Sequence, residues 1–309
     1  MNSPPEATRS LTIAICTYRR PRELTALLTE VRRSTDREAS GLAIRVVVAD
    51  DCPDGSAAAV VQAARHGLGL LVEYLNPASG NVSRARNAAI TAASNTDLVL
   101  CIDDDCTPAE GWITELLRIA DSTGADIVTG HHEFIAPDDA PAWLTAEPFL
   151  QDHGIFADGT DPAVGNMANV LLRGDWLRQS NVAFRADLGT TGGEDMVFFA
   201  DARSAGATVR HAAYSLVREP YQGFRTTTRY QLYRQAWLGN NEAAINRVTR
   251  ECSSIRLVLR GARRVATGVV RPFARAVRFE APQVRWSLAL VGSGLGLIAG
   301  VLRVRLRHR

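Results

Sequence analysis

Short apolar segments that alternate with amphipathic ones place the tightest limit on the fold of this chain. Four segments have the composition of buried strands: residues 11–16 (LTIAIC), 45–51 (RVVVADD), 70–75 and 98–102 (LVLCI). Four segments with helical periodicity follow them: residues 22–33, 57–65, 84–93 and 110–120. Apolar runs of this length, bounded by turns, indicate strands buried on both faces. The alternation predicts an α/β fold in which helices cover both faces of a parallel sheet.

Polar residues suited to ligand binding stand at the ends of three of these strands. Thr17 and Tyr18 follow the first strand, Asp50 and Asp51 end the second, and residues 103–105 are three consecutive aspartates. Ligands collect at the carboxyl ends of the strands in open parallel sheets. We therefore expect these residues to lie along one edge of the sheet and to form a binding site.

The aspartate triplet indicates a bound cation. Adjacent carboxylates repel one another, and a divalent ion offsets that repulsion. Mg²⁺ or Mn²⁺ takes carboxylate ligands together with the phosphates of a substrate, and the Asp-x-Asp pair Asp103 and Asp105 supplies such ligands. The competing interpretation is that the aspartates only cap a turn in solvent.

The absence of lysine argues against other chemistries for the same segment. All 35 cationic residues are arginine. The DDDCT run also fits Asp-x-Asp-x-Thr, the nucleophile motif of haloacid-dehalogenase-type phosphatases, but that family needs a cationic partner that is usually lysine. A receiver-type phosphoacceptor site, a Schiff base and a P-loop need lysine as well. We therefore favour the metal site.

Five segments in order resemble family 2 glycosyltransferases of the GT-A fold, especially bacterial exopolysaccharide enzymes of the succinoglycan type. They are AICTYRRPRELTALL, VVVADDCPDGS, SGNVSRARNAAI, LVLCIDDDCTP and LGTTGGEDMVFF. The likeness covers about residues 10–240. It implies a Rossmann-like mixed sheet with helices on both faces. We accordingly expect a catalytic domain over residues 1–240 and a helical tail over residues 241–309.

The resemblance also implies roles for single residues. It places six residues at the nucleotide-sugar donor: Thr17, Tyr18, Asp51, Arg86, Asp103 and Asp104. Tyr18 would stack near the nucleobase, and Asp51 would accept a hydrogen bond from it. Asp105, with Asp103, would hold Mg²⁺ or Mn²⁺. Family members often continue the acidic run by one position, where this chain has Cys106.

The GGED segment is the candidate for the catalytic base. Gly192 and Gly193 permit backbone angles and close approaches that other residues do not. Glu194 and Asp195 then open a predicted helix, whose positive end favours carboxylates. In similar enzymes the Asp of this motif deprotonates the acceptor hydroxyl, so Asp195 is the expected base, with Glu194 beside it. Alternatively, both acids only cap the helix.

Several further residues are weaker candidates. Arginines that follow the GGED segment suit a diphosphate: Arg218, Arg225, Arg229 and Arg234. His211 is either a further metal ligand or a satisfied core histidine, whereas His131 and His132 offer nothing specific. Residues 131–165 are rich in Pro, Asp and Gly, which predicts a long loop that faces the substrate.

The C-terminal part is strongly basic. Residues 1–240 carry 21 arginines against 30 acidic residues, a formal charge of −9, whereas residues 241–309 carry 14 against 3, or +11. Residues 255–279 have the pattern of a basic amphipathic helix interrupted at Pro272. Residues 286–302 are 17 uncharged residues, about 25 Å of helix.

Three interpretations of this tail stay open: an anchor on an anionic membrane surface, a short spanning helix, or a hairpin packed on the catalytic domain. Gly292, Gly296 and Gly300 recur every four residues and permit close helix contact. Nucleic acid is a poor partner, because no interleaved aromatic residues or nucleic-acid motif accompany the arginines.

The predicted function is that of an inverting, metal-dependent glycosyltransferase. It would move a sugar from a nucleotide donor, a UDP-sugar above others, to a hydroxyl of a lipid-linked glycan in cell-surface polysaccharide assembly. A soluble small-molecule acceptor and a non-catalytic nucleotide-sugar-binding scaffold are the alternatives. Five cysteines without a disulfide or zinc pattern and a polar N-terminus predict a cytoplasmic protein, peripheral on the inner face of the membrane.

Overall fold

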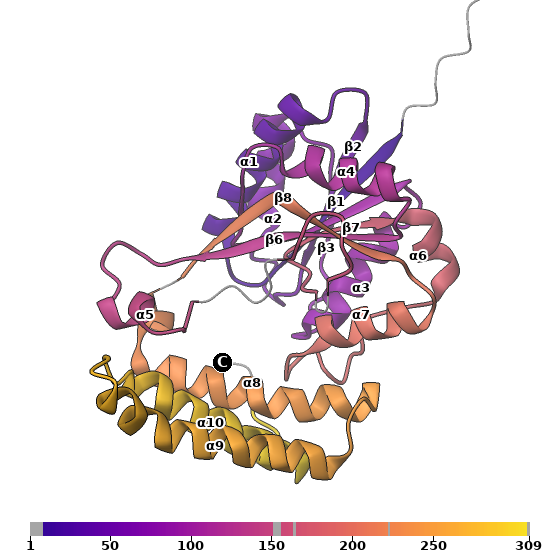
Figure 1. Cartoon of the computed structure of the whole chain (residues 1–309). Coiled ribbons are helices and arrows are strands. Elements are labelled where there is room, and N and C mark those ends of the chain that lie inside the picture. The colour runs from indigo at the N-terminus through magenta and orange to yellow at the C-terminus, as the bar shows by residue number, and fades with distance from the viewer. Residues whose placement is uncertain (1–8, 151–155, 163–164, 222, 308–309) are drawn as a thin grey trace, which may run out of the picture. The chain divides into compact units, whose positions relative to one another are not determined.

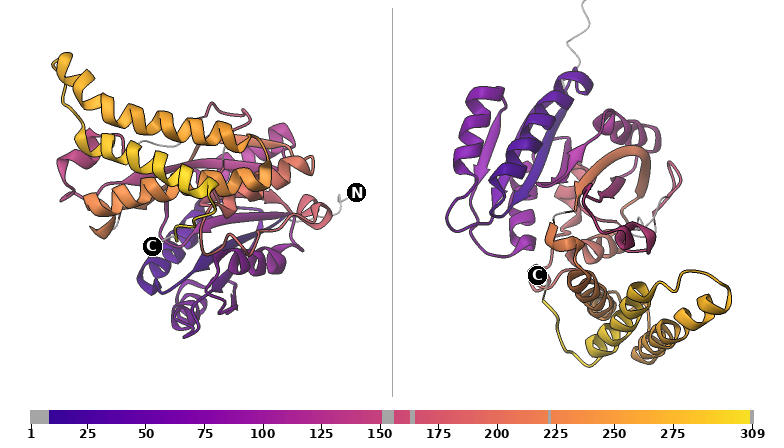
Figure 2. Two further views of the ribbon diagram at one scale, coloured as in Figure 1. Left: turned by 90° about the horizontal axis from the view of Figure 1, so that it is seen from below. Right: turned by 90° about the vertical axis from the view of Figure 1, so that its left-hand side faces the viewer.

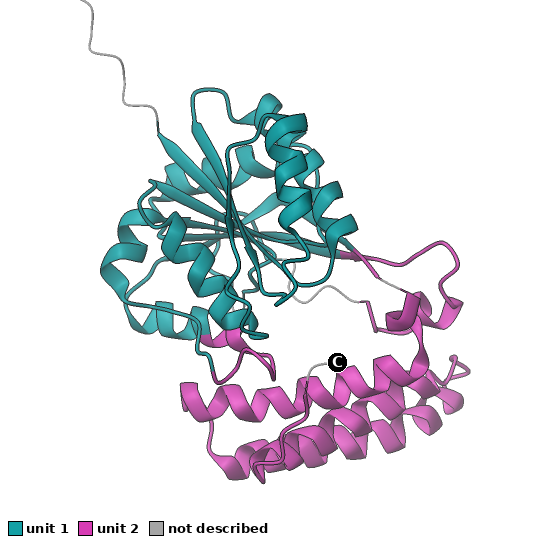
Figure 3. Ribbon diagram, turned by 180° about the vertical axis from the view of Figure 1, so that it is seen from behind, with its two compact units in different colours: residues 1–133, 153–186, 198–219 teal, residues 134–152, 187–197, 220–309 magenta. Residues whose placement is uncertain are grey.

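The computed structural model describes residues 9–150, 156–162, 165–221 and 223–307. The chain forms two compact units (Figure 3). The first comprises Met1–Glu133, His153–Ala186 and Phe198–Glu219, and the second Phe134–Asp152, Asp187–Val197 and Pro220–Arg309. Helix α8 (Thr228–Thr249) runs through residue 240 inside the second unit. The functional division at residue 240 stays a prediction.

An eight-stranded mixed sheet organises the fold (Figure 1). Its strands are β1 (Ser10–Thr17), β2 (Ala43–Asp50), β3 (Val72–Leu75), β4 (Leu98–Asp103), β5 (Thr107–Pro108), β6 (Ile127–Ile135), β7 (Asn169–Arg173) and β8 (Val209–Pro220). Their order in the sheet is β3-β2-β1-β4-β7-β6-β8-β5. Strands β1 to β4 are parallel, as the alternation predicts, but β7 pairs antiparallel with β4 and β6. The expectation of a mixed sheet is confirmed.

Two apolar cores, one on each face, hold the helices against the sheet. Along β4, Leu98, Leu100 and Ile102 enter one core and Val99 and Cys101 the other, because successive side chains of a strand point to opposite faces. The first core contains residues of α1 (Pro21–Glu38), α2 (Ala58–Ala63) and α4 (Trp112–Thr123). The second contains residues of α3 (Val82–Ala93), α6 (Gly174–Ser180) and α7 (Glu194–Ser204). Helices on both faces are therefore confirmed.

The long loop expected over residues 131–165 is wrong in part. Strand β6 extends to Ile135, and a short helix, α5 (Ala142–Ala146), follows it. The second half of β6 is only partly buried, so its sequence lacks the apolar run that marks the other strands. Residues 151–155 and 163–164 lie outside the described residues.

The predicted interruption at Pro272 is also wrong, because α9 (Ser254–Val277) continues through it. A proline inside a helix costs about 3 kcal/mol. Contacts on both sides of it hold the helix together. Gly268 lies against Ser287, and Arg271 and Arg275 bond to Gln283 and the carbonyl oxygen of Ala281.

The second unit contains three packed helices, α8, α9 and α10 (Val284–Val301), shown side by side in Figure 2. Helix α10 contacts both others through its glycines. Gly296 and Gly300 lie against backbone carbonyls of α8, and Gly294 lies against that of Gly261 in α9. The predicted glycine face is therefore a helix-packing face.

Among the described helices, α10 alone is long and apolar enough to cross a bilayer by length and composition, and 39% of it is buried within the protein. Polar side chains of α8 also form hydrogen bonds with α10 and the segment that follows it. The Asn240 amide donates to the carbonyl oxygens of Gly296 and Val304 at 3.1 and 2.9 Å, and Arg247 donates to that of Gly300 at 2.7 Å. Helices α9 and α10 thus form a hairpin within the second unit, and the choice among the three interpretations of the tail stays a prediction.

We predict that Gly296→Ala destabilises the protein by about 1–3 kcal/mol, because the added methyl overlaps the carbonyl oxygen of Ala236. Gly292→Ala is the matched control on the same helix face. Its methyl would lie 3.6 Å from the nearest atom, so the higher helix propensity of alanine should stabilise it by up to about 1 kcal/mol. Chemical denaturation measures both changes. Equal effects would contradict the tight packing of α10 on α8.

Candidate active site

The aspartates that follow β4 are held by Arg20, which the sequence analysis did not single out. Arg20 precedes α1, which begins at Pro21, in the turn after β1. Its Nη1 donates to Asp104 Oδ1 at 2.8 Å and to Asp105 Oδ2 at 2.6 Å. Thr17, at the end of β1, donates from Oγ1 to Asp104 Oδ2 at 2.7 Å. Parallel pairing of β1 with β4 brings these groups together, and the Arg19-Arg20 pair after a strand was the available signal.

One guanidinium does not offset all the negative charge of this group. The carboxyl groups of Asp104 and Asp105 are almost fully buried. Burial raises the pKa of Asp104, and burial together with the nearby charge of Glu219 raises the pKa of Asp105 to about 7. A bound cation would favour the ionised form of both groups.

Glu219 belongs to a second cluster that the sequence did not reveal. The ligand atoms of Cys106, His132 and Glu219 lie within 4.8 Å of one another, and His132 Nε2 is 3.1 Å from Glu219 Oε2. His132 comes from β6 and Glu219 from β8. Their positions in the sequence therefore gave no indication that they lie near the aspartates. His132, to which the sequence analysis assigned no specific role, thus lies in a group of possible metal ligands.

The residues present fit a hard divalent cation. Carboxylate oxygens of Asp103, Asp105 and Glu219 are ligands that Mg²⁺ and Mn²⁺ accept, and Mn²⁺ also accepts an imidazole such as that of His132. The thiol of Cys106 is a softer donor, and burial raises its pKa. The excess of negative charge at Asp105 is the observation that favours a cation here.

His211 lies in a different polar contact. Its Nδ1 is 3.0 Å from Thr129 Oγ1, and its ring meets that of Phe156 edge-on. Burial lowers its pKa, which favours the neutral imidazole. Within the described part of the chain, no group with metal-ligand spacing includes His211.

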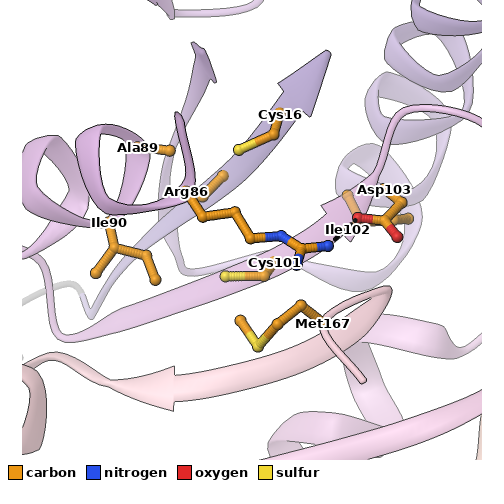
Figure 4. Close-up of a pocket in the computed structure, with 9 residues that line it drawn as sticks. Cys16, Arg86, Ala89, Ile90, Cys101, Ile102, Asp103 and Met167 are labelled. Atoms are coloured by element: carbon orange, nitrogen blue, oxygen red, sulfur yellow. Dashed lines mark hydrogen bonds and ion pairs between the residues drawn. The ribbon is translucent and has the colours of Figure 1, made fainter. Parts of the chain in front are cut away.

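Arg86 lines a pocket between α3 and the ends of β1 and β4 (Figure 4). Its Nη2 lies 3.3 Å from Asp103 Oδ1, and its guanidinium lies over the ring of Phe184 at 5.5 Å. The sulfur-containing residues Cys16, Cys101 and Met167 line the same pocket. Arg86 therefore orients Asp103, and any contact with a nucleotide is additional to this ion pair.

Asp51 shapes the loop that leads into α3. Its carboxylate accepts hydrogen bonds from Ser79 N at 2.8 Å, Ser79 Oγ at 2.7 Å and Asn81 N at 2.5 Å. Asn81 in turn caps α3 by accepting from Arg84 N. The Asp51 carboxylate thus already accepts three hydrogen bonds within the protein. The expected hydrogen bond from a nucleobase would need a further lone pair of this carboxylate.

Tyr18 presents an exposed ring at the same edge of the sheet. It is 47% exposed, and the Arg19 guanidinium lies 5.4 Å from its ring centroid. Arg19 has a positive φ of 55°, which is uncommon for a residue with a side chain and marks the sharp turn after β1. An exposed aromatic face of this kind suits stacking with a base.

The GGED segment lies in the second unit, and its glycines have the conformations that the sequence predicts. Gly192 and Gly193 have φ values of +86° and +88°. A side chain on Gly192 would overlap the ring of Trp237, whose Nε1 donates to the Thr191 carbonyl oxygen at 2.7 Å. Trp237 of α8 therefore fixes this turn. Glu194, which is buried, and Asp195 follow it in the first turn of α7.

Three of the four candidate arginines have separate surroundings. Arg218 pairs with Glu133 at 3.1 Å. In the second unit, Arg225 lies over the rings of Tyr221 and Phe224, and Arg234 over that of Phe134. A role of any of them at the diphosphate stays a prediction.

We predict that Arg20→Gln destabilises the protein by about 2–3 kcal/mol at neutral pH, because two buried carboxylates lose their counter-charge. Arg19→Gln is the matched control. Arg19 is mostly exposed and its ion pair is with the exposed Asp54, so its loss should leave the free energy of unfolding nearly unchanged. Urea denaturation at pH 7.5 measures the difference. An Arg20 variant as stable as the control would contradict the role of this ion pair.

Comparison with known proteins places these residues in a family. A sequence model described as glycosyl transferase family 2 matches residues 12–179. The succinoglycan biosynthesis protein ExoM of Rhizobium meliloti (strain 1021) is 33% identical over 216 residues, which cover 70% of this chain and 68% of that protein.

Solved structures share the fold. S. aureus TarS 1–349 in complex with UDP aligns with a TM-score of 0.53 at 14% identity, over 94% of this chain and 90% of that chain. GalNAc-T7 with UDP, GalNAc and Mn²⁺ aligns with a TM-score of 0.54 at 13% identity, over 77% of this chain and 51% of that one. Both confirm the GT-A fold class. By the family match and the likeness to ExoM, the chain belongs to glycosyl transferase family 2.

Proposed function

We propose that this protein is an inverting, metal-dependent glycosyltransferase that moves a sugar from a UDP-sugar to a hydroxyl of a lipid-linked glycan. The observation that carries the proposal is the group of acidic residues after β4, whose negative charge exceeds what Arg20 offsets. A cation with a diphosphate suits that group. The UDP and Mn²⁺ in the related structures, and the succinoglycan biosynthesis role in the name of ExoM, support it.

The donor would bind along the ends of β1, β2 and β4. Tyr18 offers an exposed ring to the nucleobase, and Asp51 holds the Ser79–Asn81 loop beside it. Thr17 and Asp104 are hydrogen-bonded to each other, so both would position the ribose and diphosphate side of the site. Arg86 would act there through Asp103.

Asp103 and Asp105 would hold the divalent cation, with Glu219 and His132 as further ligands. When bound, the cation would supply positive charge to the departing diphosphate. Before the donor arrives, Arg20 holds Asp104 and Asp105 in place, and its charge opposes the rise in pKa that burial causes in both carboxyl groups.

Asp195 would be the general base, with Glu194 as the second carboxylate of the motif. The acceptor oxygen gives its proton to the Asp195 carboxylate while it forms a bond to the anomeric carbon. The bond between that carbon and the diphosphate oxygen breaks at the same time, and UDP leaves with the electron pair. A single displacement of this kind inverts the anomeric configuration. The position at the start of α7 keeps both carboxyl groups near the positive end of the helix.

The acceptor would be presented at a membrane, and the enzyme would be peripheral on its cytoplasmic face through residues 241–309. The formal charge of +11 on these residues favours an anionic surface. Transfer to soluble sugars as fast as to lipid-linked glycans would point to a soluble acceptor instead.

We predict that Asp195→Asn lowers kcat for sugar transfer by about 100- to 10,000-fold, because the hydroxyl proton has no acceptor. The variant should still bind UDP. Asp201→Asn, on the same helix and paired with Arg185, is the control and should keep its activity. Donor turnover with a panel of nucleotide sugars provides the assay. An active Asp195→Asn enzyme would require another base, and no turnover by the wild type with any donor would favour a non-catalytic scaffold.

We predict that Asp105→Asn weakens Mn²⁺ binding in the presence of UDP by at least about tenfold. Electron paramagnetic resonance of free Mn²⁺ reports binding without any need for turnover. Asp121→Asn, at an exposed ion pair with Arg9, is the control and should bind Mn²⁺ like the wild type. Unchanged Mn²⁺ affinity in Asp105→Asn would remove this residue from the metal site.

A further inference from the structure

Helix α9 packs on its neighbour through a narrow side made of small residues. Gly261 and Gly268 lie directly against the backbone of α10, and Leu257 is the one large side chain of α9 that is fully buried. Glycines bring two helix axes close but bury little apolar surface. The side that an amphipathic helix normally buries is therefore still uncovered.

The uncovered side is an apolar stripe that runs the length of the helix. Its large members are Ile255, Leu259, Val269, Val270, Phe273 and Val277, and the exposed Ala262 and Ala266 continue it at helical spacing between Leu259 and Val269. Each large member is more than half exposed, and Phe273 and Val277 reach 72% and 80%. Contiguous exposed apolar surface of this kind marks a binding surface, whereas single exposed apolar residues do not.

Arginines border the stripe, and no acidic residue lies between positions 252 and 279. Arg260 and Arg264 turn inward and share Glu242 of α8 at 2.5 and 2.6 Å. Arg256, Arg263 and Arg278 are exposed, and none of them joins an ion pair among the residues that the structure describes. The stripe therefore lies beside positive charge that the protein itself does not neutralise.

We propose that the apolar stripe of α9 lies flat in the interfacial layer of an anionic lipid bilayer, while α10 stays inside the bundle and does not cross the membrane. The acyl region takes the apolar side chains and the lipid phosphates take the arginines. A second copy of the chain is the poorer occupant, because two surfaces of this charge repel each other. The inference rests on the peripheral location proposed above and names the helix and the face responsible.

Vesicle sedimentation of the full-length protein tests the proposal. The wild type should bind vesicles of phosphatidylcholine with 30% phosphatidylglycerol and bind pure phosphatidylcholine vesicles weakly. The double variant Leu259→Asp/Phe273→Asp should partition at least about tenfold less. Leu71→Asp, at a 70% exposed leucine of the first unit, is the matched control and should bind like the wild type. The double variant Arg256→Gln/Arg263→Gln should bind the anionic vesicles more weakly than the wild type and should bind pure phosphatidylcholine vesicles like the wild type.

Donor hydrolysis without lipid is measured on the same samples and separates the two proposals. Loss of vesicle binding with hydrolysis intact supports the α9 surface, whereas failure of hydrolysis with binding intact concerns the transferase chemistry only. Three results would overturn the inference. The first is equal vesicle binding by the wild type and the Leu259→Asp/Phe273→Asp variant, and the second is insertion of the protein into the membrane that resists extraction with carbonate. The third is a wild-type protein that is dimeric without lipid and becomes monomeric in the Leu259→Asp/Phe273→Asp variant. Circular dichroism shows whether the Leu259→Asp/Phe273→Asp variant folds. If it does not fold, vesicle binding by the Arg256→Gln/Arg263→Gln variant tests the proposal.

Discussion

Negative charge stored at the carboxyl end of β4 is the constraint on which the candidate site depends. Asp104 and Asp105 are buried, and burial alone would drive both carboxyl groups to take up protons. Arg20 counters this with a single guanidinium that bridges the two. Asp103 and Glu219 add two further negative charges, of which the Arg86 guanidinium, 3.3 Å from Asp103, offsets one. A divalent cation would offset this excess and would take a diphosphate as a further ligand, and so the same electrostatics link the fold to the proposed chemistry.

The sheet supplies the geometry for this charge. The registers of β1 with β2 and β4 place Thr17 opposite Asp50 and Cys16 opposite Asp103, so the turns after these strands leave the sheet at one edge. Buried aspartates then fix those turns. Asp50 accepts from Cys52 N and Ala57 N in one turn, and Asp51 accepts from the loop before α3. At this edge Asp50 and Asp51 thus hold the loops, whereas Asp103 and Asp105 are the proposed ligands of the cation.

Sequence patterns predicted those parts of the structure that local chemistry determines. Apolar runs predicted the parallel strands, and the glycine residue type at positions 192 and 193 predicted the unusual backbone angles that Gly192 and Gly193 adopt. The parts that failed depend on contacts distant in sequence. Arg20 meets residues more than 80 positions away, and His132 and Glu219 come together from β6 and β8, two strands that are likewise distant in sequence. Helix α9 continues through Pro272, with Gly268 packed on α10 before the proline and Arg275 bonded to the carbonyl oxygen of Ala281 after it, and no local rule reports these contacts.

The most direct test of the central claim is the anomalous diffraction of Mn²⁺ in a crystal of the protein grown with UDP and Mn²⁺. We expect a manganese peak within bonding distance of the Asp105 carboxylate, with the UDP diphosphate on its other side and the Tyr18 ring against the uracil. A manganese ion or a diphosphate bound away from residues 103–105 would contradict it.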